Sequence, residues 1–368
     1  MMNPCLQVVT FIIRLSIRLA CNLTVIGPIV YSYLVVNVTG QRTLDNKQKA
    51  IDAPPGSALI LNSPVARAFA VVGDRWAGLI LRDAFLGVRQ FEVFRKRSGA
   101  ARGTLTSRLK TLVEHGILQR RMYQQSPARH EYRLTKKGLD LYPFLMSVWD
   151  WETRWSVETH IPPDLVHTPC GQTMRPEFQC SGCHSTVAMR EVEFTRQAKL
   201  GPPETVPARF QRRTPSSKLN TDGVDRAFFH VLDVIGDRWT GLVLAAMYFG
   251  LNRYDEIASA LGIATNILSD RLKLLVAADI LEQVQYQERP IRYKYKLTEK
   301  GAALYPIALQ LHEWALRWLF KDEKPAITLT HLPCGSSLKT RLVCSACKQP
   351  LDVHEVSFDP DYSVATQA

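Results

Sequence analysis

Two matching sets of histidine and cysteine residues could bind metal ions. The first set is His167, Cys170, Cys180 and Cys183, and the second is His331, Cys334, Cys344 and Cys347. Both follow the spacing H-x2-C-x9-C-x2-C. One imidazole and three thiolates form the closed tetrahedral site that structural zinc prefers, with no open position for a catalytic water. The spacing therefore predicts two structural zinc ions, one in each of two small ribbons.

Three other interpretations of these residues stay open. The thiols could be buried or chance cysteines, or three cysteines could hold zinc while water or another group replaces the histidine. Oxidation of zinc-bound thiolates would release the metal and unfold a ribbon, so a redox response is a further alternative. Disulfides are disfavoured because the chain has eight cysteines in three groups but no clear secretory signal.

A helix with a polar face is predicted between Ile263 and Leu275. Apolar residues recur there at helical spacing, while short polar side chains, Arg and Lys lie mostly off that stripe. Such side chains suit base edges and phosphates in a DNA major groove. An ordinary amphipathic helix with a solvated face is the alternative.

A basic hairpin is predicted directly after this helix. Residues 280–286 and 292–298 alternate as strands around a short turn that contains Pro290. Arg292, Lys294 and Lys296 recur at period two and therefore share one face. A reading helix followed by such a hairpin describes a winged helix-turn-helix, whose wing would hold phosphates or a minor groove.

Four linked motifs resemble the HxlR-type family of bacterial winged-helix transcriptional regulators. They are Val234-Ile235-Gly236-Asp237-Arg238-Trp239-Thr240, the helix above, Tyr286-Gln287-Glu288-Arg289-Pro290 and Tyr295-Lys296-Leu297-Thr298-Glu299-Lys300-Gly301. The resemblance implies sequence-specific DNA binding, a dimerisation helix that carries the tryptophans, and an accessory role for the cysteine modules. Some members sense electrophiles through a cysteine before the first helix. Ser63 and Arg226 stand there in this chain, so that switch is not supported.

The motifs occur twice. Gly73-Asp74-Arg75-Trp76 recurs as Gly236-Asp237-Arg238-Trp239, an offset of 236 − 73 = 163 residues, and one inserted residue makes the offset between Cys170 and Cys334 164. A fixed offset over this length indicates a duplicated regulator unit. We expect the tryptophan-bearing helices of the two copies to pack together as an intramolecular pseudo-dimer, with recognition helices about one DNA turn, or about 34 Å, apart.

The predicted fold class is α+β, with two winged helix-turn-helix domains in tandem, each followed by a zinc-ribbon-like module. The expected boundaries are 1–58 for an apolar extension and linker, 59–160 and 161–195 for the first copy, 196–221 for a Pro-rich basic linker, 222–324 and 325–359 for the second copy, and 360–368 for a tail.

The residues expected to contact DNA are polar or basic and lie on the two recognition helices and the two wings. They are Thr104, Ser107, Arg108, Lys110, Thr265, Asn266, Ser269, Arg271 and Lys273 on the helices, and Arg129, Arg133, Arg289, Arg292 and Lys294 on the wings. Gly103 stands where the second copy has Asn266, so the second copy is the better candidate for specific readout.

Local signals in the first copy predict helices over 64–72, 74–84, 90–97 and 102–115, with Asp74 as a cap, and wing strands over 118–123 and 131–134. A single long helix is expected from Lys136 to about Glu158. Gly116 should end the first recognition helix in a left-handed conformation. Asp279 stands at that place in the second copy, where a less regular helix end is expected.

Composition narrows the class of protein. A formal net charge of +12 indicates a polyanionic partner, either nucleic acid or an anionic membrane, and 46% apolar residues suffice for packed cores. No nucleophile triad, nucleotide loop or open metal site is present, so we expect no enzyme.

Residues 19–41 carry no charge and could be a membrane anchor, an extension or a wrongly assigned start. A cytoplasmic, nucleoid-associated regulator that could form homo-oligomers is expected, or a membrane-tethered one if that segment is real; a protein-interaction module is the remaining rival.

Overall fold

The computed structural model describes residues 58–126, 128–156, 164–196, 226–320 and 323–358, all within one unit that spans residues 48–368. The apolar N-terminal segment, most of the linker over 196–221 and the tail lie outside the described residues. Among the residues that are described, no helix has the length and hydrophobicity needed to cross a bilayer.

Each copy begins with a winged helix-turn-helix. The first comprises α2 (Ala58–Leu61), α3 (Pro64–Val72), α4 (Arg75–Phe85), α5 (Phe91–Ser98), α6 (Arg102–Glu114), β1 (Leu118–Gln124), β2 (Arg129–Leu134), α7 (Lys136–Leu139) and α8 (Tyr142–Trp155). The second comprises α9 (Phe229–Ile235), α10 (Arg238–Tyr248), α11 (Tyr254–Leu261), α12 (Thr265–Ala277), β7 (Leu281–Glu288), β8 (Ile291–Leu297), α13 (Glu299–Ala302) and α14 (Tyr305–Trp318). The two expected winged helices are therefore present.

Side-chain caps start several of these helices. Asp74 accepts hydrogen bonds from the backbone N–H groups of Trp76 and Ala77, and Asp237 caps α10 in the same way. The cap satisfies donors that a helix N-terminus leaves without partners. The prediction that Asp74 acts as a cap is confirmed.

The long helix predicted from Lys136 to about Glu158 is interrupted. The chain forms α7, leaves the helix at Asp140 and starts again as α8, with Pro143 in its first turn. Proline lacks the N–H that an uninterrupted helix would use, so the break precedes it. The second copy repeats the break before Pro306.

The second recognition helix ends as regularly as the first. Asp279 adopts a left-handed conformation with φ 58°, close to the φ of 66° at Gly116. The backbone N–H of the following residue bonds back into the helix in both copies, from Ile117 to Leu112 and from Ile280 to Leu275. The expectation of a less regular end is therefore wrong, since Asp tolerates the left-handed region better than most residues.

The ribbon strands of the two copies pair with each other. The first ribbon contains β3 (Leu165–His167), β4 (Gln172–Met174), β5 (Pro176–Cys180), η1 (Met189–Glu191) and β6 (Val192–Arg196), and the second contains β9 (Ile327–His331), β10 (Ser336–Ser337), β11 (Thr340–Cys344) and β12 (Val356–Phe358). Antiparallel pairs join β5 to β11, β3 to β12 and β6 to β9. The expectation of two separate modules over 161–195 and 325–359 is corrected, because each ribbon completes its sheets with strands of the other.

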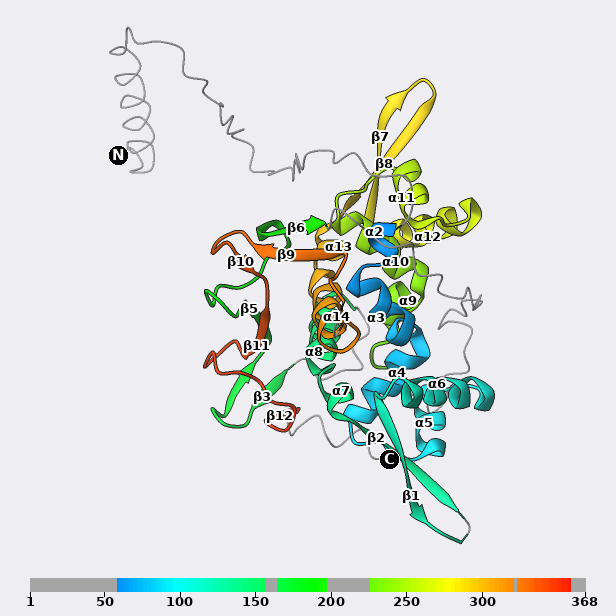
Figure 1. The fold of residues 1–368 in the computed structure, drawn as a ribbon, viewed down its shortest axis with the longest axis vertical. Coiled ribbons are helices and arrows are strands. Elements are labelled where there is room, and N and C mark those ends of the chain that lie inside the picture. The colour runs from blue at the N-terminus through cyan, green and yellow to red at the C-terminus, as the bar shows by residue number, and fades with distance from the viewer. Residues whose placement is uncertain (1–57, 127, 157–163, 197–225, 321–322, 359–368) are drawn as a thin grey trace, which may run out of the picture. The chain divides into compact units, whose positions relative to one another are not determined.

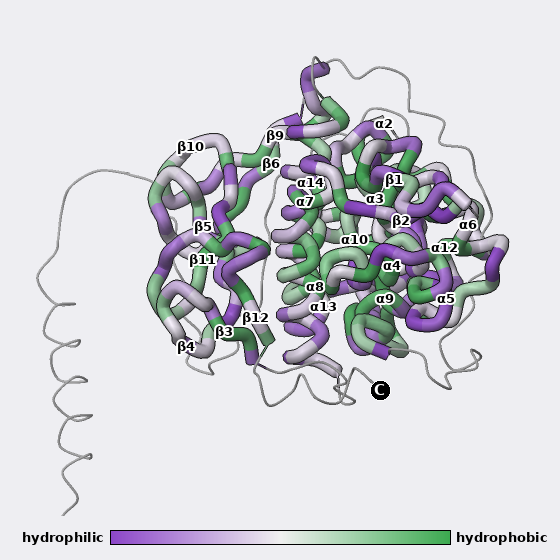
Figure 2. The backbone as a smooth tube through the Cα atoms, turned by 90° about the horizontal axis from the view of Figure 1, so that it is seen from below, coloured by the Kyte–Doolittle hydropathy of each residue, from purple (hydrophilic) through white to green (hydrophobic). Residues whose placement is uncertain are grey.

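The helices α8 and α14 lie side by side between this ribbon layer and the remaining helices (Figures 1 and 2). Both views place α6 and α12 on the side of α8 and α14 that faces away from the ribbons. Figure 1 also shows the two wings pointing in opposite directions. The fold therefore separates the recognition helices from the cysteine clusters.

Helix α3 of the first copy and helix α9 of the second each pack against the other copy. A methyl group built at Gly241 in α10 would lie 2.6 Å from Cζ of Phe69 in α3, and one at Gly78 in α4 would lie 2.7 Å from Cδ2 of Leu232 in α9. These four positions are related by the 163-residue offset. Glycine at both places lets the helices approach closely enough to bury one continuous core through both copies.

Tryptophan side chains add two reciprocal hydrogen bonds between the copies. The indole N–H of Trp151 donates to the backbone oxygen of Lys300 at 3.0 Å, and that of Trp314 donates to the backbone oxygen of Lys137 at 2.9 Å. Buried indole groups need such a partner. The expectation that the tryptophan-bearing helices would pack on each other within one molecule agrees with these contacts.

Candidate DNA-binding face and metal clusters

The recognition helices are held by leucines on their inner sides. Leu105, Leu109 and Leu112 of α6 are buried, as are the corresponding leucines of α12, Leu268, Leu272 and Leu275. Their outer sides carry the polar residues expected to contact DNA. Exposed residues of this set are Ser107, Lys110, Thr265, Asn266 and Lys273, while Thr104 and Ser269 are half-buried. Most of the predicted reading face is therefore accessible.

Arg108 and Arg271 lie elsewhere. Arg108 forms an ion pair with Asp74 at 3.0 Å, and its side chain is 11% exposed. Arg271 pairs with Asp237 at 3.1 Å and is 17% exposed. Each guanidinium thus holds a recognition helix against the aspartate that caps the preceding long helix, so these two predicted groove residues point inward rather than to the polar outer face.

The wings carry the expected basic residues, and Arg129, Arg289 and Arg292 are exposed. Arg133 donates to Glu131 at 2.6 Å and is partly neutralised by it. Each wing is also hydrogen-bonded to the loop that precedes α5 or α11. The backbone N–H of Tyr132 donates to the backbone oxygen of Arg89, and that of Tyr295 donates to the backbone oxygen of Asn252. These bonds fix the direction in which each wing leaves the domain.

The eight predicted metal ligands gather into two clusters, but not with the predicted partners. One cluster consists of His167, Cys170, Cys344 and Cys347, and the other of Cys180, Cys183, His331 and Cys334. Each therefore combines the H-x2-C turn of one copy with the C-x2-C turn of the other. The assignment of one complete site to each ribbon is wrong.

Strand pairing explains the exchange. In the β5–β11 pair, Cys344 lies opposite Pro176 and Cys180 lies opposite Thr340. Five residues of extended chain cover about 14 Å between the first and last Cα atoms, so β5 carries Cys180 away from the cluster near its start. The same pairing brings Cys344 to the place that Cys180 leaves.

The geometry of both clusters is that of a four-ligand metal site. All donor atoms within a cluster lie within 4.8 Å of one another. His331 Nδ1 lies 3.4 Å from the sulfurs of Cys183 and Cys334, and Cys180 Sγ lies 3.9 Å from Cys334 Sγ. A tetrahedral ion with metal–sulfur bonds of about 2.3 Å requires edges of about 3.6 to 3.8 Å. The donors are therefore spaced to share one ion.

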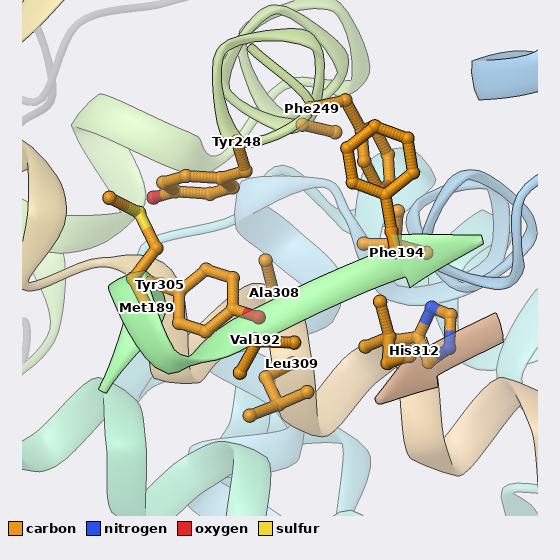
Figure 3. A pocket seen from close by; sticks show the side chains of 12 residues that line it. Met189, Val192, Phe194, Tyr248, Phe249, Tyr305, Ala308, Leu309 and His312 are labelled. Carbon is orange, nitrogen blue, oxygen red and sulfur yellow. The ribbon is translucent and has the colours of Figure 1, made fainter. Parts of the chain in front are cut away.

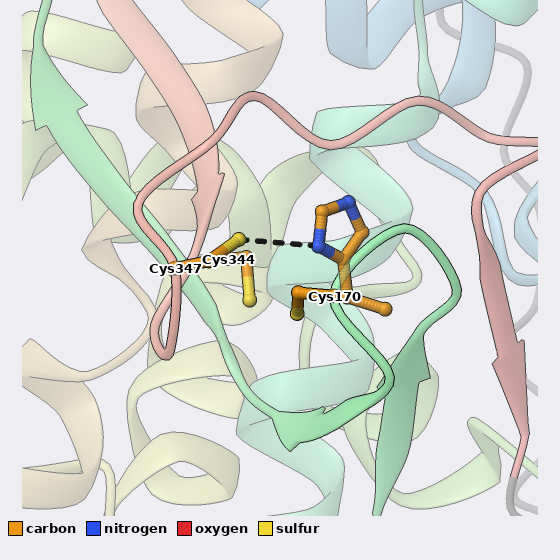
Figure 4. Close-up of side chains that lie close together, drawn as sticks. Cys170, Cys344 and Cys347 are labelled. Carbon is orange, nitrogen blue, oxygen red and sulfur yellow. Dashed lines mark hydrogen bonds between the residues drawn. The ribbon is translucent and has the colours of Figure 1, made fainter.

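Figure 4 shows Cys170, Cys344 and Cys347 converging on one point, and its dashed line joins Cys347 Sγ to His167 Nδ1 at 3.3 Å. Tight turns aim these groups, with Gly171 and Gly335 at φ 66° directly after the first cysteine of each copy. In the H-x2-C turn the backbone N–H of Gly171 donates to the backbone oxygen of His167. The second copy has the same bond from Gly335 to His331.

Local hydrogen bonds favour the thiolate at two of the cysteines. The backbone N–H of Ser336 and the ring of His331 lower the pKa of Cys334 to about 6. The backbone N–H of Gln349 lowers the pKa of Cys347. Burial raises the pKa of Cys170 and Cys180. Each cluster thus contains one thiol that ionises readily, and the thiolate is the form that binds metal.

Comparison with known proteins agrees with the architecture. The model of the HxlR-like helix-turn-helix family matches residues 71–160 and 234–323. An uncharacterised HTH-type transcriptional regulator of Mycobacterium tuberculosis is 41% identical over 129 residues, which cover 35% of this chain and 82% of the relative. The chain belongs to the HxlR-like helix-turn-helix family.

Two further similar proteins match shorter stretches. The regulator YvaP of Bacillus subtilis is 34% identical over 102 residues, or 27% of this chain and 94% of the relative. The solved structure of diamide-treated YodB from Bacillus subtilis is 31% identical, covers 26% of this chain and 91% of that one, and has a TM-score of 0.21. The two matches to the family model establish the tandem duplication, and the protein is a DNA-binding transcriptional regulator.

Sequence reasoning missed some exposed groups on the HxlR-like domains. Arg102 at the start of α6 is largely exposed and pairs with Glu92, and Tyr123, Tyr286 and Tyr293 project from the wings. At the 163-residue offset Arg102 corresponds to Thr265, and Thr265 is an expected DNA contact. A position-by-position comparison of the copies would have found it.

Proposed function

We propose that this regulator binds one asymmetric DNA site as an intramolecular pseudo-dimer, with α6 and α12 in successive major grooves and the two wings on the flanking backbone. The observation that carries the proposal is the reciprocal packing of the two copies, through Trp151 with Lys300 and Trp314 with Lys137. This packing gives one chain the two-fold arrangement that dimeric helix-turn-helix proteins use to span adjacent half-sites.

The two reading faces are chemically different, which supports an asymmetric site. Gly103 in α6 corresponds to Asn266 in α12, and Ser107 corresponds to Asp270. Asn can recognise adenine through two hydrogen bonds, whereas Gly offers no side-chain contact. We propose Asn266 as the main base reader, with Thr104, Ser107, Lys110, Thr265, Ser269 and Lys273 beside it and Arg129, Arg133, Arg289, Arg292 and Lys294 on phosphates.

Arg108 and Arg271 have another role in this proposal. Their ion pairs with Asp74 and Asp237 hold each recognition helix on the core, so they position the reading face without contacting bases. Replacement of either arginine should therefore reduce DNA affinity through loss of helix placement and should also lower the thermal stability.

We further propose that each cluster binds one zinc ion that links the two copies. The donor set, one imidazole nitrogen and three thiolates, is typical of structural zinc. A closed set of four ligands supports folding rather than catalysis. Because each ion would join the H-x2-C turn of one copy to the C-x2-C turn of the other, zinc would stabilise the pseudo-dimer as well as the ribbons.

The proposed DNA site can be tested by selecting duplexes from a random library with the full chain and mapping the bound site by hydroxyl-radical footprinting. We expect two protected segments of different sequence, with centres about 34–36 Å apart along the helix. A palindromic site, or a single protected segment, would contradict the arrangement.

Two variants separate base reading from phosphate contact at the selected site. Asn266→Ala should weaken binding of that site by about 1–3 kcal/mol and relax the preference at one position. Arg292→Ala should weaken binding of all sequences alike and reduce the salt dependence by about one counterion. Fluorescence anisotropy at several salt concentrations measures both effects, and equal loss on selected and random DNA for Asn266→Ala would remove it as a reader.

A further inference from the structure

Residues of both copies line a hollow that the proposed DNA and zinc functions do not use. It lies between α10, α14 and the paired strands β6 and β9 (Figure 3). The volume free of protein atoms is about 490 Å³, part of which is open to solvent. The space in which the centre of a water molecule fits is about 50 Å³. A bound water needs roughly 10–15 Å³ of such interior space, so several waters or part of a small molecule would fit.

Aromatic side chains form much of the wall. Phe194 meets Phe249 edge to face with ring centroids 4.9 Å apart, and Tyr248 meets Tyr305 in the same manner at 5.3 Å. Among the lining residues that the structure describes, none is an Asp, Glu, Lys or Arg. Such a wall favours a neutral ring-shaped ligand over an ion, because an ion would lose its hydration without gaining a counter-charge.

One polar side chain in this wall lacks a partner. His312 is 4% exposed, and its Nε2 atom is buried without a hydrogen-bond partner in the described part of the chain. Burial lowers the pKa of His312 to about 4, so the imidazole is neutral at pH 7. A buried polar atom without a partner costs free energy, which a ligand recovers when its hydroxyl group reaches this covered nitrogen.

The first copy has larger side chains at the matching positions. Trp149 corresponds to His312 and Leu145 corresponds to Ala308, and both residues of the first copy are buried. The two substitutions remove much of the side-chain volume that fills this place in the first copy. These two positions therefore leave more space beside α14 than beside α8.

We propose that this hollow binds a small neutral aromatic alcohol of the phenol type, with its ring among the four aromatic side chains and its hydroxyl group hydrogen-bonded to His312. A hydroxyl can donate to or accept from the imidazole, so it matches either tautomer. Met189 at the edge has a flexible side chain that can make room for a six-membered ring.

A ligand in this hollow would contact helices that position α6 and α12. The wall includes Ala245 of α10, which packs against α12, and Val65 of α3, which belongs to the first copy. Occupation should therefore change the spacing of α6 and α12 and alter DNA affinity. This consequence rests on the proposed DNA function, whereas binding of the ligand itself does not.

The test uses phenol and toluene as probes on the full chain, with saturation-transfer NMR and titration calorimetry in the absence of DNA. We expect phenol to bind more tightly than toluene. His312→Phe should reduce the preference for phenol by about 3- to 10-fold, the effect of one hydrogen bond. Ala308→Leu, which introduces the side chain of the first copy, should weaken binding of both probes.

Met146→Leu, at the position of the first copy that corresponds to Leu309, is the matched control and should bind both probes like the unmodified chain. Absence of phenol binding to a folded chain, or equal binding to the Ala308→Leu variant, would overturn the proposal. Phenol binding without any change in DNA affinity would leave the site in place and remove only its link to DNA.

Discussion

At the residue scale, the same side-chain type serves different purposes according to its neighbours. Arg271 and Lys273 are two positions apart on one helix, yet Arg271 pairs with the half-buried cap Asp237 while Lys273 is exposed. Helical geometry turns residues two positions apart to different faces. The inward placement of Arg271 depends on Asp237, which lies 34 residues earlier in the chain.

A carboxyl group is buried where α8 of the first copy meets α9 of the second. Glu152 of α8 is 3% exposed and accepts hydrogen bonds from the backbone N–H groups of His230, at 3.2 Å, and Val231, at 2.7 Å, in the first turn of α9. Burial raises its pKa from 4.5 to about 7, although the two hydrogen bonds act in the opposite direction. The second copy has Ala315 at the matching position, so this carboxyl group has no counterpart there at the 163-residue offset, although burial also raises the pKa of Glu313 in α14 to about 7.

We predict that Glu152→Gln removes part of the pH dependence of stability. A pKa that is higher in the folded state contributes stability below pH 4.5, and this contribution is lost as pH rises through about 7. The free energy of unfolding of the unmodified chain, relative to the variant, should therefore fall between pH 5 and pH 8, by at most about 3 kcal/mol. Urea unfolding at both pH values measures this difference, and parallel pH profiles would exclude the effect.

At the scale of elements, α3 and α9 each bury their apolar side against helices of the other copy. Helix α3 packs on α10 and α14, and α9 packs on α4 and α8, so each copy supplies part of the other's core. The glycines at these crossings are required by close approach, because a side chain at Gly241 would meet the ring of Phe69. The wings need no such exchange and form from adjacent strands.

Two glycine-to-alanine variants should have opposite effects. Gly241→Ala places a methyl group 2.6 Å from the Phe69 ring and should lower the free energy of unfolding by about 1–3 kcal/mol. Gly103→Ala lies on an exposed helix with nothing within 4 Å of the added methyl, and it should raise stability by up to about 1 kcal/mol. Denaturant unfolding compares the two, and equal stabilisation by both would argue against the close helix crossing.

At the scale of the whole described unit, the two copies depend on each other for cores, sheets and metal clusters. The ribbon strands pair across the copies, and both clusters draw ligands from both. Each cluster takes two of its four ligands from each copy. Removal of the proposed zinc ions should therefore weaken the connection between the copies and, through α8 and α14, the placement of the recognition helices.

Paired cysteine variants distinguish shared sites from separate ones by counting zinc. Cys170→Ser with Cys347→Ser alters one cluster and should leave one ion per chain, whereas Cys170→Ser with Cys180→Ser alters both and should leave none. Each variant loses two cysteines, so they control for each other. Native mass spectrometry and elemental analysis give the counts, and the reverse pattern would show that each ribbon binds its own ion.

The sequence by itself determined the duplication, the winged-helix fold, the cap at Asp74 and the identity of the eight candidate ligands. These follow from local periodicity, turn residues and motif spacing, which act over short stretches of chain. The tertiary structure alone decided which ligands share a cluster, why Arg108 and Arg271 face inward, and where a hollow beside His312 lies. Those outcomes depend on contacts between residues far apart in the sequence, from 34 positions for Arg271 and Asp237 to 340 − 180 = 160 positions for Cys180 and Thr340. An identical spacing in two copies is satisfied equally well by ligands from one copy or from both, so only the register of β5 on β11 selects between them.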